Sequence, residues 1–221
     1  MNKSEVIKQI REIGVIPVVR ATNADEAMRA IDAIREGGVS VFEITMTVPG
    51  AVALIEQVAS RFGKDALVGA GTVLHPDTAK ACISSGAQFI VSPSLDKGMI
   101  EYCSSRRVVV MPGALTPTEV VQAWNAGADF VKVFPAGAVG GATYIKALKA
   151  PLPQIELVPT GGVSLKTAGD FIRAGAAALG VGTDLVDLKA IREGQASIIT
   201  ERAKQFVEIV REARHQDAQT K

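Results

Sequence analysis

The sequence has few of the residues that build metal centres and disulfide frameworks. Only two cysteines and two histidines occur among its 221 residues. Cys82 and Cys103 show no metal-ligand spacing, and His75 lies far along the chain from His215. We therefore expect two free thiols, no metal site and no bound cofactor.

Long apolar runs and an excess of one charge are missing as well. No apolar run reaches membrane-spanning length, and the N-terminus, Met1 to Glu5, lacks the hydrophobic segment of a secretory signal. The net charge is +1 with both signs mixed along the chain, so no basic stripe is available for nucleic acid. We expect a cytoplasmic protein with neither a membrane nor a nucleic acid as its partner.

The chain does have enough apolar residues for a large core, and it repeats one pattern. Hydrophobic residues make up 48% of the sequence, and four times a helix-like stretch ends on glycine shortly before an apolar strand begins. Glycine suits the left-handed C-cap of a helix. The four copies start at Gly37, Gly86, Gly127 and Gly175. Their spacing, roughly 40 to 50 residues, fits two βα units per copy.

Filling the intervals between these copies gives eight βα units. The strands are expected near residues 15–20, 41–46, 67–72, 89–93, 108–113, 130–135, 155–160 and 178–182. Helix starts are marked by Asn23 to Glu26, Pro76 to Thr78 and Thr116 to Glu119. Residues 2–13 are expected to form an extra amphipathic helix, and residues 195–214 a closing helix before a polar tail at 215–221.

Eight such units favour a single domain over residues 1–221. The expected fold is α/β, a closed (β/α)8 TIM barrel with the extra N-terminal helix. A doubly wound open sheet is the second choice. It is disfavoured because the segment after the first strand, Val19 to Ala24, contains no glycine and so no dinucleotide-binding fingerprint.

Lys132 is the most unusual residue of the sequence, because it lies inside an apolar strand between Val131 and Val133. Desolvation disfavours the charged form of such an ammonium, and a neutral lysine amine is a nucleophile. It forms Schiff bases with carbonyl carbons, which turns a ketone into an electron sink and lets an adjacent carbon–carbon bond break or form. The alternative is a structural lysine that pairs with a carboxylate.

Glu43 occupies the same place in its repeat as Lys132 does. It follows Gly38 by five residues, as Lys132 follows Gly127. The two belong to the second and sixth expected strands, and alternate strands of a barrel supply side chains to one interior layer. Because buried charges are almost never unpaired, we expect Glu43 and Lys132 to meet, either as a catalytic pair or as a structural ion pair.

Glycine-rich loops follow the seventh and eighth strands. Thr160, Gly161 and Gly162 come after the seventh strand, and Gly182 and Thr183 lie at the end of the eighth. Glycines there let backbone N–H groups approach an anion, and these loops are where such barrels bind phosphate. The sequence predicts a phosphate-binding site here, with tight turns as the alternative role of the glycines.

Four residues at other strand ends are weaker candidates for a substrate site. Arg20, at the end of the first strand, could hold a carboxylate or a phosphate, or lie in solvent at the rim. Thr72 ends the third strand and could donate its hydroxyl group to a substrate carboxylate. Pro93 and Phe134 would wall the pocket, although such residues at strand ends mostly serve packing.

With these residues assembled, the chain resembles the 2-dehydro-3-deoxy-6-phosphogluconate (KDPG) aldolases, some of which also cleave 4-hydroxy-2-oxoglutarate (KHG). The resemblance extends over nearly the whole length. The matching stretches are Phe42-Glu43-Ile44-Thr45, Gly69-Ala70-Gly71-Thr72-Val73, Gly86 to Pro93, Met111-Pro112-Gly113, Val131 to Ala136 and Pro159-Thr160-Gly161-Gly162-Val163.

The resemblance implies roles for the candidate residues. Lys132 would be the Schiff-base lysine and Glu43 the general acid/base. The pyruvate portion of the substrate would be surrounded by Thr72, Pro93 and Phe134. Its phosphate would be bound by Gly161, Gly162, Gly182 and Thr183. Members of this family are metal-independent homotrimers, so the resemblance implies the same assembly here.

One departure from the family pattern concerns Thr47. Many members have arginine there, two residues after the threonine of the Glu-x-Thr motif, where it grips the substrate carboxylate. Arg20 becomes the substitute anchor. The expected reaction is the cleavage of KDPG to pyruvate and glyceraldehyde 3-phosphate, and that of KHG to pyruvate and glyoxylate.

Other functions stay open on the sequence. A related aldolase for another 2-keto-3-deoxy sugar acid fits the same residues, as does a barrel that binds a phosphorylated metabolite without catalysis. A metal-dependent aldolase, or a sugar-phosphate isomerase with Glu43 as its base, is the remaining competitor.

Overall fold

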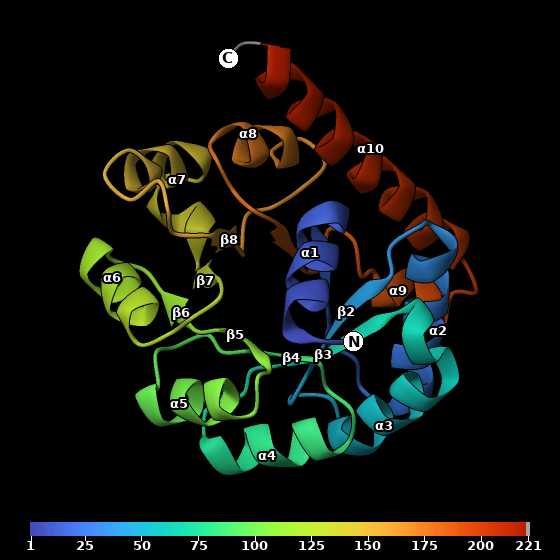
Figure 1. Cartoon of the computed structure of the whole chain (residues 1–221). Coiled ribbons are helices and arrows are strands. Elements are labelled where there is room, and N and C mark those ends of the chain that lie inside the picture. Colours follow the sequence, from blue (N-terminus) through green and yellow to red (C-terminus); the bar gives the residue numbers. More distant parts are fainter. Residues whose placement is uncertain (220–221) are drawn as a thin grey trace.

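Helices surround a central set of parallel strands. The computed structural model describes the backbone of residues 1–219 and the side chains of residues 1–216. Figure 1 shows α2 to α8 and α10 around the strands, with α1 lying across them. The helices are α1 (Lys3–Ile13), α2 (Ala24–Glu36), α3 (Ala51–Phe62), η1 (Gly63–Asp65), α4 (Pro76–Ser84), α5 (Lys97–Ser105), α6 (Pro117–Asn125), η2 (Ala136–Val139), α7 (Ala142–Lys149), α8 (Ala168–Arg173), α9 (Leu188–Arg192) and α10 (Ser197–Gln219).

Each of the eight expected strand ranges holds an observed strand. The strands are β1 (Val15–Val19), β2 (Val41–Thr45), β3 (Leu67–Gly71), β4 (Phe89–Val91), β5 (Val109–Met111), β6 (Gly113–Ala114), β7 (Val131–Val133), β8 (Leu157–Pro159) and β9 (Leu179–Val181). They pair in parallel as one sheet of order β5-β4-β3-β2-β1-β9 and a second of order β6-β7-β8. The expectation of an α/β fold with a parallel sheet is confirmed.

The two sheets are joined on both sides. A parallel bridge between Thr160 and Gly180 links the end of β8 to β9. On the other side, β5 and β6 are separated only by Pro112, which has no N–H group to continue the ladder. The Pro112 carbonyl still accepts a hydrogen bond of 2.9 Å from the Lys132 N–H group. The sequence did not predict this break in the fifth expected strand.

Glycine and capping residues end and begin the helices where the sequence indicated. The four repeated patterns each contain a left-handed glycine, with φ of 91° at Gly38, 101° at Gly86, 100° at Gly127 and 96° at Gly175. At the expected helix starts, Asn23 caps α2, Pro76 begins α4 and Thr116 caps α6. The repeat is therefore real and sets the length of each unit.

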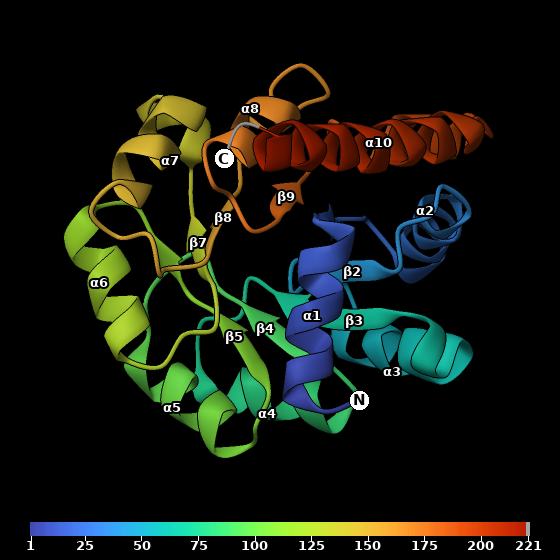
Figure 2. The same cartoon turned by 45° about the horizontal axis from the view of Figure 1, so that its top comes forward.

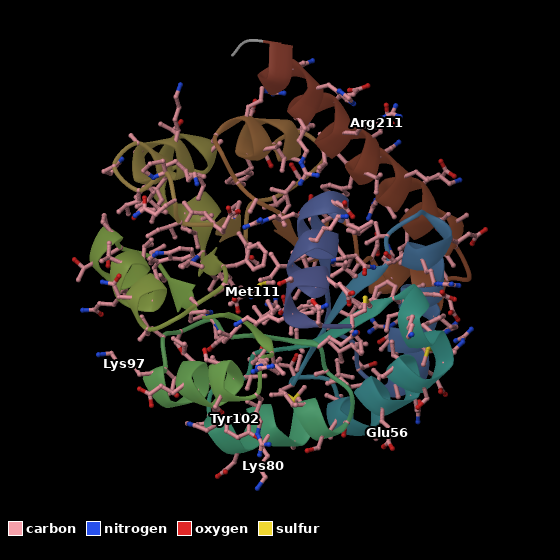
Figure 3. The ribbon with its side chains drawn as sticks, in the orientation of Figure 1. Glu56, Lys80, Lys97, Tyr102, Met111 and Arg211 are labelled. Carbon is pink, nitrogen blue, oxygen red and sulfur yellow. The ribbon has the colours of Figure 1, made fainter. Side chains whose placement is uncertain are left out.

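The apolar residues divide into two clusters. The larger cluster fills the space between the strands and the outer helices. The smaller one lies inside the strands, and α1 adds Val6 and Ile10 to residues such as Val41, Leu67 and Phe89 at the starts of strands. Figure 2 shows α1 from a second direction, again against the strands. In Figure 3, the labelled Met111 points inward, whereas Lys80, Lys97 and Arg211 extend outward. The interior is thus closed by α1 at the N-terminal ends of the strands.

The closing helix is longer than expected. It runs from Ser197 to Gln219, so most of the segment assigned to a polar tail at 215–221 is helical, and residues 220–221 lie outside the described part. No glycine or proline follows Gly194 in the sequence, which leaves nothing to break the helix at residue 214. Arg214 donates hydrogen bonds to the carbonyls of Glu12 (2.9 Å) and Ala177 (3.1 Å), which ties this helix to α1 and β9.

Candidate active site

Lys132 lies at the centre of β7 with its side chain almost wholly enclosed. The residue is 3% exposed, and its neighbours in the strand, Val131 and Val133, are fully buried. Its Nζ atom lies 5.5 Å from the centre of the Phe134 ring, within the range of a cation–π contact. The amine is thus enclosed by apolar and aromatic groups, and a lysine amine in its uncharged form is a nucleophile.

Glu43 is the partner that the sequence register indicated. Its Oε1 atom lies 3.7 Å from Lys132 Nζ, and its residue is 2% exposed. The distance is that of an ion pair and too long for a hydrogen bond. Among the described residues, no group donates a hydrogen bond to Oε1, although that atom is buried. The pair therefore leaves one carboxylate oxygen free to accept a proton or a hydrogen bond from a bound molecule.

Two glycines of β3 make room for neighbouring side chains, and one of these side chains is that of Glu43. An added Cβ atom at Gly71 would lie 2.0 Å from Glu43 Oε1, and one at Gly69 would lie 2.2 Å from the Phe89 ring. Both distances are far inside van der Waals contact, so any larger residue at Gly71 would displace the carboxylate. The sequence marked this stretch, but only the structure explains why it needs glycine.

The loops after β1, β8 and β9 enclose a cavity of about 130 Å³. Its lining includes seven of the predicted site residues, namely Arg20, Phe134, Thr160, Gly161, Gly162, Gly182 and Thr183. Val18, Val163, Gly180 and Asp184 line it too, and they are not among the predicted site residues. Phe134 connects this cavity to the buried pair, because Lys132 Nζ faces its ring.

The backbone of the glycine-rich loops adopts conformations that favour glycine. Gly161 and Gly162 adopt left-handed φ values of 85° and 77°. At Gly180, an added Cβ atom would lie 2.1 Å from Thr160 Oγ1, so this glycine makes room for the Thr160 side chain. The pattern Gly-Val-Gly at 180–182 is a signal for Gly180, but nothing in the sequence distinguishes Asp184 from an ordinary cap or loop residue.

Two larger cavities adjoin this one through Thr183. One, of about 420 Å³, is lined by Arg20, Gly182, Thr183 and the segment from Val186 to Lys189. The other, of about 530 Å³, has Thr183, Asp184, Lys166 and Arg202 in its lining. Neither includes Lys132 or Glu43. We place the chemistry at the buried pair rather than in these two larger cavities, because Lys132 Nζ and Glu43 Oε1 lie 3.7 Å apart and both residues are almost fully buried.

Thr72 and Pro93 lie outside these three cavities. Thr72 follows β3 and has a left-handed φ of 58°, which is rare for a β-branched residue. Pro93 follows β4, and its carbonyl group occupies the place that a Cβ atom of Gly113 would need, at 2.2 Å. Both residues therefore follow the C-terminal ends of their strands, outside the cavity lining.

Thr47 forms a hydroxyl pair where the sequence lacks the family arginine. Its Oγ1 atom lies 2.6 Å from Thr45 Oγ1, and Thr45 Oγ1 donates to the Val19 carbonyl at 3.2 Å. These bonds tie the end of β2 to the residue before Arg20. Arg20 itself is exposed and forms no ion pair or hydrogen bond within residues 1–216. Its guanidinium group is available to an anion.

Two further properties follow from the described part of the chain. Within residues 1–219, every helix falls short of the length and apolar character that a membrane crossing requires. In the same part, no three histidine, cysteine, aspartate or glutamate side chains come together in a way that could hold a metal ion.

Comparison with known proteins identifies the family. A family model described as KDPG and KHG aldolase matches residues 6–202. The 2-dehydro-3-deoxy-6-phosphogalactonate aldolase of Escherichia coli K12 is 36% identical over 204 residues, 91% of this chain and 97% of that protein.

Solved structures agree with this result. A KDPG aldolase from Legionella pneumophila, with pyruvate captured at low pH as a covalent carbinolamine, aligns with a TM-score of 0.83 and 29% identity over 90% of this chain and 96% of that chain. A cage designed by fusing symmetric oligomeric domains aligns with a TM-score of 0.86 and 35% identity over 94% of this chain and 76% of that chain. The chain belongs to the KDPG and KHG aldolase family and is an aldolase, a carbon–carbon lyase.

Proposed function

We propose that this aldolase cleaves KDPG to pyruvate and glyceraldehyde 3-phosphate through a Schiff base on Lys132. The observation that carries the proposal is the buried approach of Lys132 Nζ to Glu43 Oε1, at 3.7 Å, with that oxygen unpaired among the described residues. A nucleophile and an adjacent proton acceptor are the two groups that a Schiff-base aldol cleavage requires.

The first half of the reaction forms an iminium ion. Lys132 passes a proton to Glu43, and its neutral Nζ adds to the C2 carbonyl carbon of the substrate. The resulting carbinolamine loses its hydroxyl group as water when Glu43 returns that proton. The iminium nitrogen is now the electron sink. The captured carbinolamine in the Legionella relative supports this order of events.

The second half breaks the C3–C4 bond. The Glu43 carboxylate takes the proton of the C4 hydroxyl group, the C3–C4 bonding electrons move into the iminium, and glyceraldehyde 3-phosphate leaves. Glu43 then returns that proton to C3 of the enamine. Water hydrolyses the resulting iminium, which frees pyruvate and regenerates the Lys132 amine.

The remaining site residues bind the substrate in this proposal. The loop glycines Gly161, Gly162 and Gly182, with Thr160 and Thr183, hold the phosphate, and Arg20 holds the carboxylate in place of the arginine that Thr47 replaces. Thr72, Pro93 and Phe134 surround the pyruvate portion. The shared cavity supports the roles of Arg20, Phe134 and the loops.

An aldolase of the same kind for another sugar acid is the second candidate. The 36% identical relative acts on 2-dehydro-3-deoxy-6-phosphogalactonate, which favours this substrate as the first alternative to test. KHG, named in the family description, is the next. A barrel that binds a phosphorylated metabolite without catalysis has no support from membership in a family of aldolases.

We also propose a barrel architecture and a homotrimeric state for this protein. The joined strands and a core cluster that extends from Val15 to Ala213 support a single domain and a closed (β/α)8 barrel preceded by α1. The likeness to the designed cage of symmetric oligomeric domains supports an oligomer, for which we propose a homotrimer in the cytoplasm. Light scattering after gel filtration tests the assembly, and a monomeric mass would contradict it.

Borohydride trapping tests the chemistry. The protein is mixed with pyruvate and reduced, and the adduct is located by intact mass and peptide mapping. We expect a reduced pyruvyl adduct on Lys132 and none in the variant Lys132→Met. Lys149 is an internal control: burial lowers the pKa of its amine, which donates hydrogen bonds to the carbonyls of Pro153 and Ile155. An adduct on Lys149, or no adduct at all, would exclude the mechanism.

A further inference from the structure

Glu26 is a buried carboxylate that the proposed reaction does not use. It lies in the first turn of α2 and is 2% exposed. Its Oε2 atom accepts hydrogen bonds of 2.9 Å from both the N–H and the hydroxyl group of Thr22. Its Oε1 atom accepts a hydrogen bond from Arg192 Nε, on the last residue of α9. The Glu26 carboxylate thus joins the loop at Thr22 to Arg192, which is 166 positions from Glu26 in the sequence.

Both of these segments form walls of the cavities beside the buried pair. Thr22 lies two residues after Arg20, in the short loop between β1 and α2. Helix α9 follows the loop that carries Gly182 and Thr183, and its first residues, Leu188 and Lys189, line the cavity of about 420 Å³ together with Arg20. Glu26 therefore connects the loop after β1 with the end of α9, and it is not part of the cavity lining.

The ionic form of Glu26 is the one that holds the walls together. Burial alone would raise the pKa of Glu26, but the hydrogen bonds from Arg192 and Thr22 outweigh it and keep the pKa below its ordinary value. The group is charged at neutral pH, and a buried carboxylate with three donors is a rigid connection because breaking it leaves a desolvated charge.

We propose that Glu26 is a positioning residue that sets the place of Arg20 relative to Gly182 and Thr183, and with it the affinity for the anionic groups of the substrate. The inference rests on the proposed function and goes beyond it, because Glu26 touches neither the substrate nor the reacting atoms. Removal of an interaction that serves substrate binding alone raises KM and leaves kcat unchanged.

The chain offers a control at the equivalent helix position in Glu119, which is exposed where Glu26 is buried. This residue occupies the same position in the first turn of α6 and accepts hydrogen bonds from Leu115 N–H (2.9 Å), Thr116 N–H (2.8 Å) and Thr116 Oγ1 (2.9 Å). It has no arginine partner among the described residues, and none of these three residues lines the cavities around Thr183. Glu119→Gln therefore weakens a helix start without disturbing the walls.

The experiment compares steady-state kinetics of the full-length protein with KDPG in Glu26→Gln, Arg192→Gln, the double variant and Glu119→Gln. We expect KM to rise about 10-fold in the first two, with kcat within about twofold of the unchanged protein. The double variant should match the single ones, because both substitutions break one connection. Arg29 still donates to the Ile191 carbonyl at 3.3 Å, so α9 should stay folded beside α2 in these variants although its connection to Thr22 through Glu26 is lost.

Three results would overturn the inference: an unchanged KM in Glu26→Gln, an equal rise of KM in Glu119→Gln, or a fall in kcat at constant KM. At saturating pyruvate, trapping on Lys132 should reach the same extent in all variants, since none of the substitutions changes the buried pair. If the unchanged protein neither traps pyruvate nor turns over KDPG, the proposed function fails. In that case, the binding of inorganic phosphate is measured by calorimetry. About 10-fold weaker binding by Glu26→Gln would support the role of Glu26, and equal or absent binding would overturn it.

Discussion

The two ends of the strand interior are built on opposite principles. At the N-terminal ends of the strands, α1 buries Val6 and Ile10 against apolar residues, and the Arg214 guanidinium group donates to two carbonyls. At the C-terminal ends, the interior holds Lys132 and Glu43 with an unpaired oxygen, and Thr72 has an unfavourable backbone conformation. One end is filled by apolar side chains, and the other keeps a buried carboxylate oxygen that has no hydrogen-bond partner among the described residues.

This difference shows how one fold can separate stability from chemistry. Unpaired buried polar groups and strained residues destabilise a protein, so they persist where function requires them. The apolar packing of α1 at the far end stabilises the same domain and offsets that loss. If this division holds, substitutions at the two ends should affect different measurements.

The largest effect is expected from removing both charges of the buried pair. The double variant Lys132→Met with Glu43→Gln should lose at least about 1,000-fold in turnover of KDPG, because it has neither nucleophile nor base. Its free energy of unfolding should be unchanged or higher by about 1–4 kcal/mol, since a buried ion pair is replaced by neutral side chains. Urea denaturation checks the second value. A clear loss of stability would mean that the pair is structural.

The opposite result is expected at the closed end. Ile10→Ala removes a fully buried side chain of α1 and should lower the free energy of unfolding by about 2–5 kcal/mol. The kcat of the folded protein should stay within about twofold, because Ile10 lies far from the pair along the strands. Urea denaturation and kinetics on the same sample measure both quantities, with the exposed Lys8→Ala as control. A matching loss of kcat would contradict the division between the ends.

Gly71→Ala should affect both properties. The new Cβ atom would lie 2.0 Å from Glu43 Oε1 and push the carboxylate away from Lys132, so we expect about a 100-fold loss of kcat. Overpacking should also lower stability by about 1–3 kcal/mol. Gly98→Ala is the matched control, because a Cβ atom there has only ordinary contacts, the nearest at 3.4 Å from Pro76, and lies in helix α5. That variant should keep its activity.

A smaller effect depends on pH and concerns Glu26. Its pKa in the folded protein lies below the ordinary value of about 4.3, so its contribution to stability is fully present above that value. The contribution is lost as the pH falls through the folded pKa. The difference in unfolding free energy between the unchanged protein and Glu26→Gln should therefore be constant from pH 7 to about 5 and shrink below that. Urea denaturation at several pH values measures it, and a difference that stayed constant at acid pH would contradict the assignment.

The smallest expected effect is the low reactivity of the thiols. Burial raises the pKa of Cys82 to about 11 and that of Cys103 to about 12, so both are protonated at pH 8. The native protein should resist alkylation by iodoacetamide, and both residues should react once urea unfolds it. Mass spectrometry counts the modified residues. Rapid reaction of Cys82 in the native state would show that α4 opens locally.

The repeat explains what could be predicted from the sequence. Each copy contains a left-handed glycine and runs into a buried strand, so the equal offsets of Glu43 from Gly38 and of Lys132 from Gly127 are enough to place both in one layer. Helix starts are equally local, as the caps of α2 and α6 show. Features that depend on a few neighbouring residues and on a fixed period are readable from a single chain.

Features that depend on contacts between residues far apart in the sequence could not be predicted from the sequence. The contact between Glu26 and Arg192 joins residues that no periodicity relates, and the cavity lining by Asp184 depends on how the loop after β9 turns. The positions of Thr72 and Pro93 outside the cavity have the same cause. The length of α10 was missed because a polar sequence alone does not distinguish a solvated helix from a tail.

The absence of a side chain at Gly71 also limits how a protein of this kind can diverge. Thr47 and Arg20 lie on loops and can be exchanged one at a time as a lineage shifts from one sugar acid to another. Gly71 and Glu43 cannot, because any gain of atoms at residue 71 enters the volume of the Glu43 carboxylate. Their replacements must arrive together. A descendant with a larger residue at position 71 would therefore have abandoned this carboxylate, and with it the ancestral reaction, whatever the rest of its sequence retained.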